Sequence, residues 1–274
     1  MKMLNLVRMD FYRLIRSKSF YACLAFLLAT IFMCYGIIFI VDTPEGQQLA
    51  PKIGMSMLVG MEDSENSESV LEGVDFITML RQSCTDGGAY HLTFGIMVAI
   101  FICMDFQSGF IKNIMSMHQK RWKYVISKLL VIGIADFSYL IICCTFAVLM
   151  NLMFHNLVPF GRGQDILFYL SWVWLVTMAF AALIIMLCVI TKNMAVGVTM
   201  AVLLGSGLII IPFVAITSWF NADGWFNYTI YYNISYGPSS YSVPADLKVF
   251  AIGAVFLAIY SITAVIVSAK RDVA

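Results

Sequence analysis

Residues 20–41 read FYACLAFLLATIFMCYGIIFIV, a run without a charged side chain. A helix needs about 20 apolar residues to cross the ~30 Å hydrocarbon core of a bilayer, so this run is long enough to span a membrane. It exceeds the ~7–15 residue core of a secretory signal, and no small-residue cleavage motif follows it. We therefore expect a permanent transmembrane anchor and not a cleaved signal peptide.

Five further apolar runs follow along the chain. They predict membrane spans at residues 89–104, 129–150, 166–190, 195–216 and 249–268. Hydrophobic residues make up 61% of the 274 residues and charged residues only 12%, whereas soluble proteins carry about 25% charged residues. The sequence therefore predicts an all-α polytopic membrane protein with six transmembrane helices, forming one transmembrane domain over residues 1–274.

The distribution of positive charge predicts the orientation of these helices. Residues 1–19 combine apolar positions at helical spacing with five lysines and arginines, which is typical of an amphipathic helix in the headgroup region. With the N-terminus inside, 13 lysines and arginines lie on the cytoplasmic side and four on the opposite side. The positive-inside rule then places both termini in the cytoplasm. Residues 42–88, which are rich in acidic residues, and residues 217–247 become the long outer loops.

Several motifs that carry chemistry are missing from the sequence. It contains no G-x-x-x-x-G-K-[ST] phosphate loop and no H-E-x-x-H, and its three histidines are far apart. No Ser/His/Asp set stands at a credible spacing. We expect no catalytic, cofactor-binding or metal site in this chain, and no nucleic-acid partner.

Small residues recur every four positions in two of the predicted spans. Gly197, Ala201 and Gly205 form one such series, and Ala25 and Ala29 a shorter one. Small residues at this spacing let a second helix approach closely inside a membrane. The second helix belongs either to another copy or relative of this chain, which makes the series a dimer interface, or to the same chain.

Asp136 is the one acidic residue deep in an apolar run. A charge there costs at least ~2.5–3.5 kcal/mol, so the side chain is expected to face the protein interior or water. One interpretation is a group on a substrate path or a proton relay. The other is a polar clip, to Ser138 or Tyr139 nearby or to another helix.

The predicted outer loop 217–247 is rich in aromatic residues and has no lysine or arginine. Aromatic side chains of this kind gather at the boundary between membrane and water. An interfacial belt or a re-entrant element is one interpretation, and contact with an amphipathic substrate is the other. The candidates for substrate contact are Trp219, Trp225, Tyr231 and Tyr232.

The segment after the second span, residues 105–128, reads DFQSGFIKNIMSMHQKRWKYVISK. An acidic residue, a glycine four positions later and an Ile-Lys-Asn-Ile run resemble the permeases of the ABC type-2 exporter family, although Phe110 stands where many members have Thr. The resemblance implies a cytoplasmic coupling helix that docks on an ATPase, and a connecting helix at the N-terminus. The coupling residues it implies are Asp105, Gly109, Lys112, Asn113, His118, Lys120 and Arg121.

The same resemblance implies the function that we expect. The chain would be the permease of a bacterial cell-membrane exporter, with a cytoplasmic ABC ATPase dimer binding and hydrolysing ATP and a second permease chain, identical or related, beside it. The smaller bacterial members of that family favour a peptide substrate. An exporter of lipid, drug or ion, or a secondary transporter that uses Asp136, are the alternatives.

Overall fold

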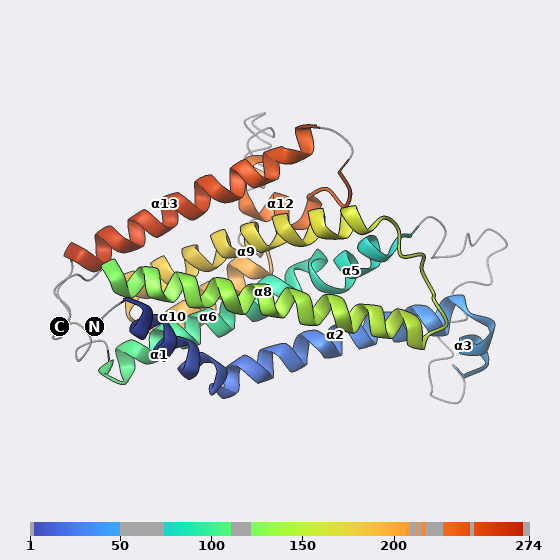
Figure 1. Cartoon of the computed structure of the whole chain (residues 1–274), viewed down its shortest axis with the longest axis horizontal. Coiled ribbons are helices and arrows are strands. Elements are labelled where there is room, and N and C mark those ends of the chain that lie inside the picture. Colours follow the sequence, from blue (N-terminus) through green and yellow to red (C-terminus); the bar gives the residue numbers. More distant parts are fainter. Residues whose placement is uncertain are drawn as a thin grey trace.

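The computed structural model describes residues 3–49, 74–110, 122–208, 212, 215–216, 227–241 and 244–270, and these residues contain helices and no strand. Figure 1 shows the long helices running roughly side by side. The elements are α1 (Met3–Ile15), α2 (Lys18–Asp42), α3 (Pro44–Leu49), α5 (Phe76–Cys84), the 3-10 turn η2 (Asp86–Gly88), α6 (Ala89–Gln107), α8 (Trp122–Met153), α9 (Gly163–Thr191), α10 (Met194–Gly205), α12 (Ile230–Tyr236), the 3-10 turn η4 (Pro244–Leu247) and α13 (Lys248–Lys270).

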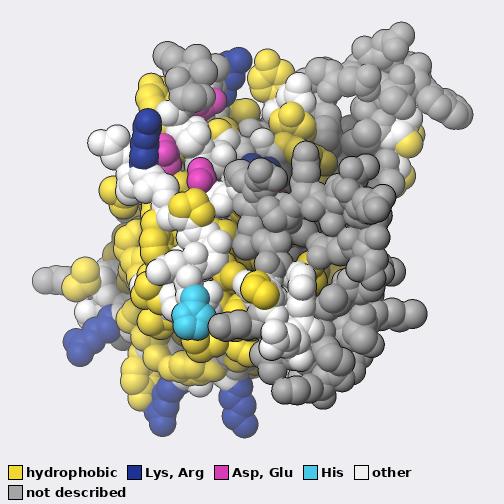
Figure 2. Space-filling view, turned by 90° about the vertical axis from the view of Figure 1, so that its right-hand side faces the viewer, with side chains coloured by type: hydrophobic (Ala, Val, Ile, Leu, Met, Phe, Trp, Pro, Cys, Tyr) yellow, Lys and Arg dark blue, Asp and Glu magenta, His cyan; other side chains and the backbone are white. Residues whose placement is uncertain are grey.

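Five of the six predicted spans are confirmed as long apolar helices. Helices α2, α6, α8, α9 and α13 are each long and apolar enough to cross a membrane. Helices α6 and α9 form the centre of the bundle, whereas α2 and α13 keep many apolar side chains exposed. Figure 2 shows mostly hydrophobic side chains down the described flank of the bundle. The predicted class, an all-α polytopic membrane protein, is therefore confirmed.

The predicted span 195–216 differs from the structure. It begins correctly, as α10, but this helix ends at Gly205 after 12 residues. At 1.5 Å per residue it covers about 18 Å, less than the ~30 Å of a full crossing. The reason is the Gly-Ser-Gly sequence at 205–207, where Gly207 adopts a left-handed conformation with φ of 74°, a common way to end a helix.

Helix α1 and the C-terminal end of α13 lie at the same end of the molecule, which we call the terminal end (Figure 1). Helix α6 ends and helix α8 begins there too. Helix α3 and the far end of α8 lie at the opposite end, which we call the loop end. The described residues on either side of 111–121 therefore both lie at the terminal end.

Helix α1 packs more deeply against the protein than we expected for a helix that lies in the headgroup region. Its buried face consists of Leu6, Asp10 and Leu14, which recur every four residues and lie against α8. Leu4 is 77% exposed. The helix therefore has a protein-facing side with an acidic residue at its centre, which a headgroup-lying helix would not need.

Two segments predicted as long loops contain helices that pack into the bundle. Residues 42–88 include α3 and α5, and the apolar side of α5 is buried. Residues 217–247 include α12, which contacts α9 and α13. Arg81 of α5 donates to the carbonyl oxygen of Gly237 at 2.7 Å and so joins the two segments. The interpretation of 217–247 as an interfacial belt or re-entrant element stays a prediction.

Candidate functional site

A cluster of charged side chains joins three helices at the terminal end. Lys128 of α8 lies at its centre, with Nζ 2.8 Å from Oδ1 of Asp10 on α1 and 2.6 Å from Oδ2 of Asp105 on α6. All three side chains are completely buried. Arg13 of α1 completes the set, with Nη2 2.7 Å from Oδ1 of Asp105. We call Asp10, Arg13, Asp105 and Lys128 the charge cluster.

Helix α1 supplies two members of the charge cluster from positions three residues apart, which lie on one helix face. Asp10 and Arg13 are three apart on α1. On α8, the Ser127 hydroxyl donates to Oδ2 of Asp10 at 2.8 Å, and the Tyr124 hydroxyl donates to Oδ2 of Asp105 at 3.1 Å. The two carboxylates therefore gain neutral donors in addition to their cations.

Two aromatic rings cover the cations of the charge cluster. The Arg13 guanidinium lies 4.0 Å from the ring centre of Phe110, and Lys128 Nζ lies 4.1 Å from that of Phe101. Cations are attracted to the faces of aromatic rings, most strongly where water is excluded. Two carboxylates and two cations balance, so the charge cluster is neutral. It holds the terminal ends of α1, α6 and α8 together.

The charge cluster lies directly before the segment with the predicted coupling residues. Asp105 is part of α6, which ends two residues later. Gly109 follows with φ of 67°, a left-handed conformation that glycine adopts without strain, and a Cβ there would meet nothing within 4 Å. Helix α6 therefore ends in a turn at Gly109, directly before residues 111–121 in the sequence.

The prediction that Asp105 contacts an ATPase is wrong in one respect, because its side chain is completely buried in the charge cluster. It anchors the start of the segment and offers no surface to a partner. Gly109 is placed at the turn. The other predicted coupling residues lie outside the described part of the chain: Lys112, Asn113, His118, Lys120 and Arg121.

The sequence analysis missed Asp10 and Lys128 as site residues. Both were counted only as parts of basic segments. A signal was present at Asp10, which stands four residues after Leu6 and four before Leu14. An acidic residue centred on an apolar helix face predicts a buried cationic partner on a neighbouring helix.

Asp136 of α8 is buried and bonded to another helix. Its Oδ1 accepts a hydrogen bond from the Tyr90 hydroxyl on α6 at 2.7 Å. Ser138 and Tyr139, the nearby partners considered above, bond instead to the backbone oxygens of Ile134 and Phe20. The contact thus agrees with the interpretation as a clip between helices.

The series Gly197, Ala201 and Gly205 packs against α6 of the same chain. A Cβ on Gly197 would lie 3.2 Å from Sγ of Cys103 on α6 and 2.7 Å from Sγ of Cys188 on α9. One on Gly205 would lie 2.7 Å from the Cα of Leu92 on α6. Ala201 is completely buried. Their assignment to a dimer interface is therefore corrected, because α6 already occupies the face that a second subunit would need.

The contact of α10 with α6 has small residues on both sides. A Cβ on Gly95 of α6 would lie 3.3 Å from Cβ of Ala201, and one on Gly197 would lie 3.6 Å from Cβ of Ala99. We call this contact the α6–α10 seam. Ala25 and Ala29 on α2, in contrast, are exposed, so the interface interpretation stays a prediction for these two.

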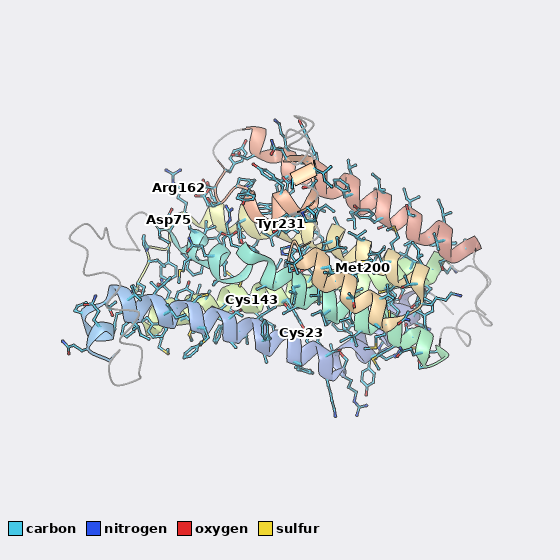
Figure 3. All side chains as sticks on the ribbon, turned by 180° about the vertical axis from the view of Figure 1, so that it is seen from behind. Cys23, Asp75, Cys143, Arg162, Met200 and Tyr231 are labelled. Atoms are coloured by element: carbon cyan, nitrogen blue, oxygen red, sulfur yellow. The ribbon has the colours of Figure 1, made fainter. Side chains whose placement is uncertain are left out.

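The described aromatic candidates pack within the protein. Tyr231 of α12 lies directly against Gly207, where a Cβ would collide with the phenol ring, and Figure 3 shows it reaching from α12 toward the end of α10. The ring of Tyr232 lies 5.2 Å from that of Tyr236. Trp219 and Trp225 lie outside the described residues.

Among the described residues, no group of three or more histidine, cysteine, aspartate or glutamate side chains is arranged to hold a metal ion. A bundle of helices long and apolar enough to cross a membrane, with a buried polar clip between two of them, defines a polytopic membrane protein. A comparison with curated proteins gives no match. A family model does match the chain.

The matching family is the ABC-2 family transporter protein, and the match covers residues 72–208, half of the chain. The chain belongs to this family. It is a transport permease component that is not itself catalytic, and its family implies an ABC ATPase as partner. The match runs from the start of α5 to the end of α10, and it includes Asp105, Lys128, Asp136 and the α6–α10 seam.

Proposed function

We propose that this chain is the permease subunit of an ATP-driven exporter in a bacterial cell membrane. A cytoplasmic ABC ATPase dimer would bind and hydrolyse ATP, and a second permease chain, identical or related, would complete the transporter. The observation that carries the proposal is the charge cluster. It ties the start of the 105–121 segment to α1 and α8, so a push on that segment reaches three helices together.

The terminal end would then face the cytoplasm, because 13 of the 17 lysines and arginines fall on its side in the predicted topology. Closure of the ATPases on ATP would displace residues 111–121. The bundle would respond by changing between two packings and not by continuous bending, since packed interiors are bistable. The cargo would leave at the loop end.

An amphipathic or hydrophobic cargo suits the loop end best, and a peptide is our preferred candidate. Aromatic residues concentrate in 217–247, where a molecule that partitions into the interface would be released. The acidic character of 42–88 would attract cationic peptides over short range, since salt limits such attraction to ~8 Å. Lipid, drug or ion export remains the alternative, as does a secondary transporter using Asp136.

The ATPase partner is tested by purification from the native membrane in mild detergent. We expect a stoichiometric ATPase chain to accompany the permease. Charge reversal at Lys112 and Arg121, or Gly109→Trp, should leave the permease inserted but uncouple ATP hydrolysis from transport. Arg162→Glu, a charge reversal at the loop end, is the control and should transport normally. Unchanged transport in all three coupling variants would reduce the segment to a positively charged loop.

The cargo is tested by stimulation of ATP hydrolysis in the purified complex. Amphipathic peptides should stimulate hydrolysis more than lipids, drugs or sodium do. Stimulation by one of the latter alone would refute the peptide assignment and leave the exporter architecture in place. If the chain transports without any ATPase, and if Asp136→Asn abolishes that transport, the secondary transporter would be favoured instead.

A further inference from the structure

A pocket of about 270 Å³ opens beside the charge cluster, and the coupling role described above does not use it. It lies where the end of α1, the first turn of α2 and the last turns of α6 meet. The residues that line it are Tyr12, Arg13, Arg16, Ser17, Ser19, Phe101 and Met104. Its walls are therefore of two kinds, one basic and hydroxylated and the other apolar.

The basic wall carries Arg16, whose charge is unbalanced in the described part of the chain. Arg16 is exposed, and its Nη1 donates to the Tyr12 hydroxyl at 2.7 Å, which fixes the guanidinium without neutralising it. Arg13 shares its Nη2 with Asp105 and has an Nη1 without a hydrogen-bond partner. A guanidinium that is held in place and lacks an anion is suited to a phosphate group.

Hydroxyl groups and a helix start add to this wall. Ser17 caps α2, a helix of 25 residues, and the Ser19 hydroxyl lies 3.4 Å from the Ser17 hydroxyl. The N-terminal end of a long helix carries a partial positive charge that favours anions. The hydroxyls and the helix start thus act in the same direction as the two arginines.

The apolar wall places the pocket at the edge of the hydrocarbon. Phe101 is buried at the base, whereas Met104 is 48% exposed in the last turn of α6. Both α2 and α6 are membrane-crossing helices, and Ser19 and Met104 lie at their ends. The ends of crossing helices lie at the level of lipid headgroups. A soluble partner would have to reach into the headgroup region to enter the pocket, whereas membrane lipids already occupy that region.

We propose that this pocket binds the phosphate of one anionic phospholipid, with Arg16 as its principal ligand. The phosphate lies against Arg16 and the Ser19 hydroxyl, and the glycerol and upper acyl chain lie on Phe101 and Met104. The lipid is held between α1, α2 and α6, so it fixes the corner at which the first crossing helix meets the charge cluster.

The test is native mass spectrometry of the full chain, purified in detergent and titrated with phosphatidylglycerol. We expect one lipid per chain in the wild type and at least a ~10-fold weaker affinity in Arg16→Gln. Ser19→Asp should weaken binding as well, because it places a carboxylate on the pocket wall while favouring the start of α2. Arg8→Gln removes the same charge from an exposed position of α1 outside the pocket and should stay within twofold of wild type.

Three further additions distinguish the sources of the phosphate. Diacylglycerol, which has the same chains and no phosphate, should bind poorly, and inorganic phosphate should not compete at millimolar concentration. Equal binding of diacylglycerol, competition by inorganic phosphate, displacement of the lipid by the purified ATPase, or an equal loss in Arg8→Gln would each overturn the proposal. The measurement needs neither ATP nor transport, so its result is independent of the proposed exporter function.

Discussion

Replacement of Lys128 by Met should destabilise the protein more than any other single change at the charge cluster. The ammonium group lies within 2.8 Å of two completely buried carboxylates. Without it, Arg13 is the only cation left in the charge cluster, and it contacts Asp105 and not Asp10, so the buried charge of Asp10 is uncompensated within the cluster. Removing one partner of a buried ion pair costs about 3–5 kcal/mol, and the lost contact with Phe101 adds to this.

The free energy of unfolding can be measured in mixed micelles by titration with SDS, with tryptophan fluorescence as the signal. Lys128→Met should lose about 3–5 kcal/mol. The control is Lys123→Met on the same helix, outside the charge cluster, which should stay within about 0.5 kcal/mol of wild type. The double variant Asp10→Asn/Lys128→Met restores neutrality and should be more stable than Lys128→Met alone. A double variant as unstable as the single one, or no loss in Lys128→Met, would refute the charge-balance argument.

Other predictions concern the α6–α10 seam, a buried thiol and the topology. Gly197→Leu should lose at least about 1–3 kcal/mol in the same titration because its side chain meets two sulfur atoms, whereas Gly36→Leu should not, since a Cβ there meets nothing within 4 Å. A hydrogen bond with Cys143 of α8, together with burial, raises the pKa of the Cys84 thiol well above its ordinary value. The thiolate is the reactive form, so alkylation of Cys84 at pH 8 should be at least ~10-fold slower in the folded protein than in SDS, and equal rates would contradict its burial. A cysteine at Ser240 should react with an impermeant reagent in intact cells, and one at Ser116 only after the membrane is opened; external labelling of position 116 would reverse the orientation.

The crossing helices were predictable because the thickness of the hydrocarbon core sets a minimum length for an apolar helix. The length of an apolar run can be read directly from the sequence. The predicted first span begins at Phe20 and α2 begins at Lys18. The end of α10 was missed because the run of apolar residues continues past Gly205, whereas the helix ends there. There the conformation of Gly207 and its contact with Tyr231 decide the end of the helix.

The charge cluster was not predictable from charge counting, because Asp10 and Lys128 are 118 residues apart. Counting treats every lysine and arginine on one side of the membrane alike, although Lys128 is completely buried and Arg8 is exposed. Only the burial of each helix face distinguishes a charge that orients the protein from one that holds helices together. The periodicity around Asp10 contained that information for one of the two residues.

The packing around α6 indicates which helices can move relative to one another. Along the α6–α10 seam, Gly205 lies so close to Leu92 that an added Cβ would be 2.7 Å from its Cα, and Gly88 lies directly against Gly205. Close-packed contacts leave little free volume and transmit strain from one element to the next. We therefore expect helices α6 and α10 to move as one unit. Since Asp105 ties the terminal end of α6 to α1 and α8, a displacement of residues 111–121 would be resisted first at the charge cluster, and the α6–α10 pair would follow it as a rigid body.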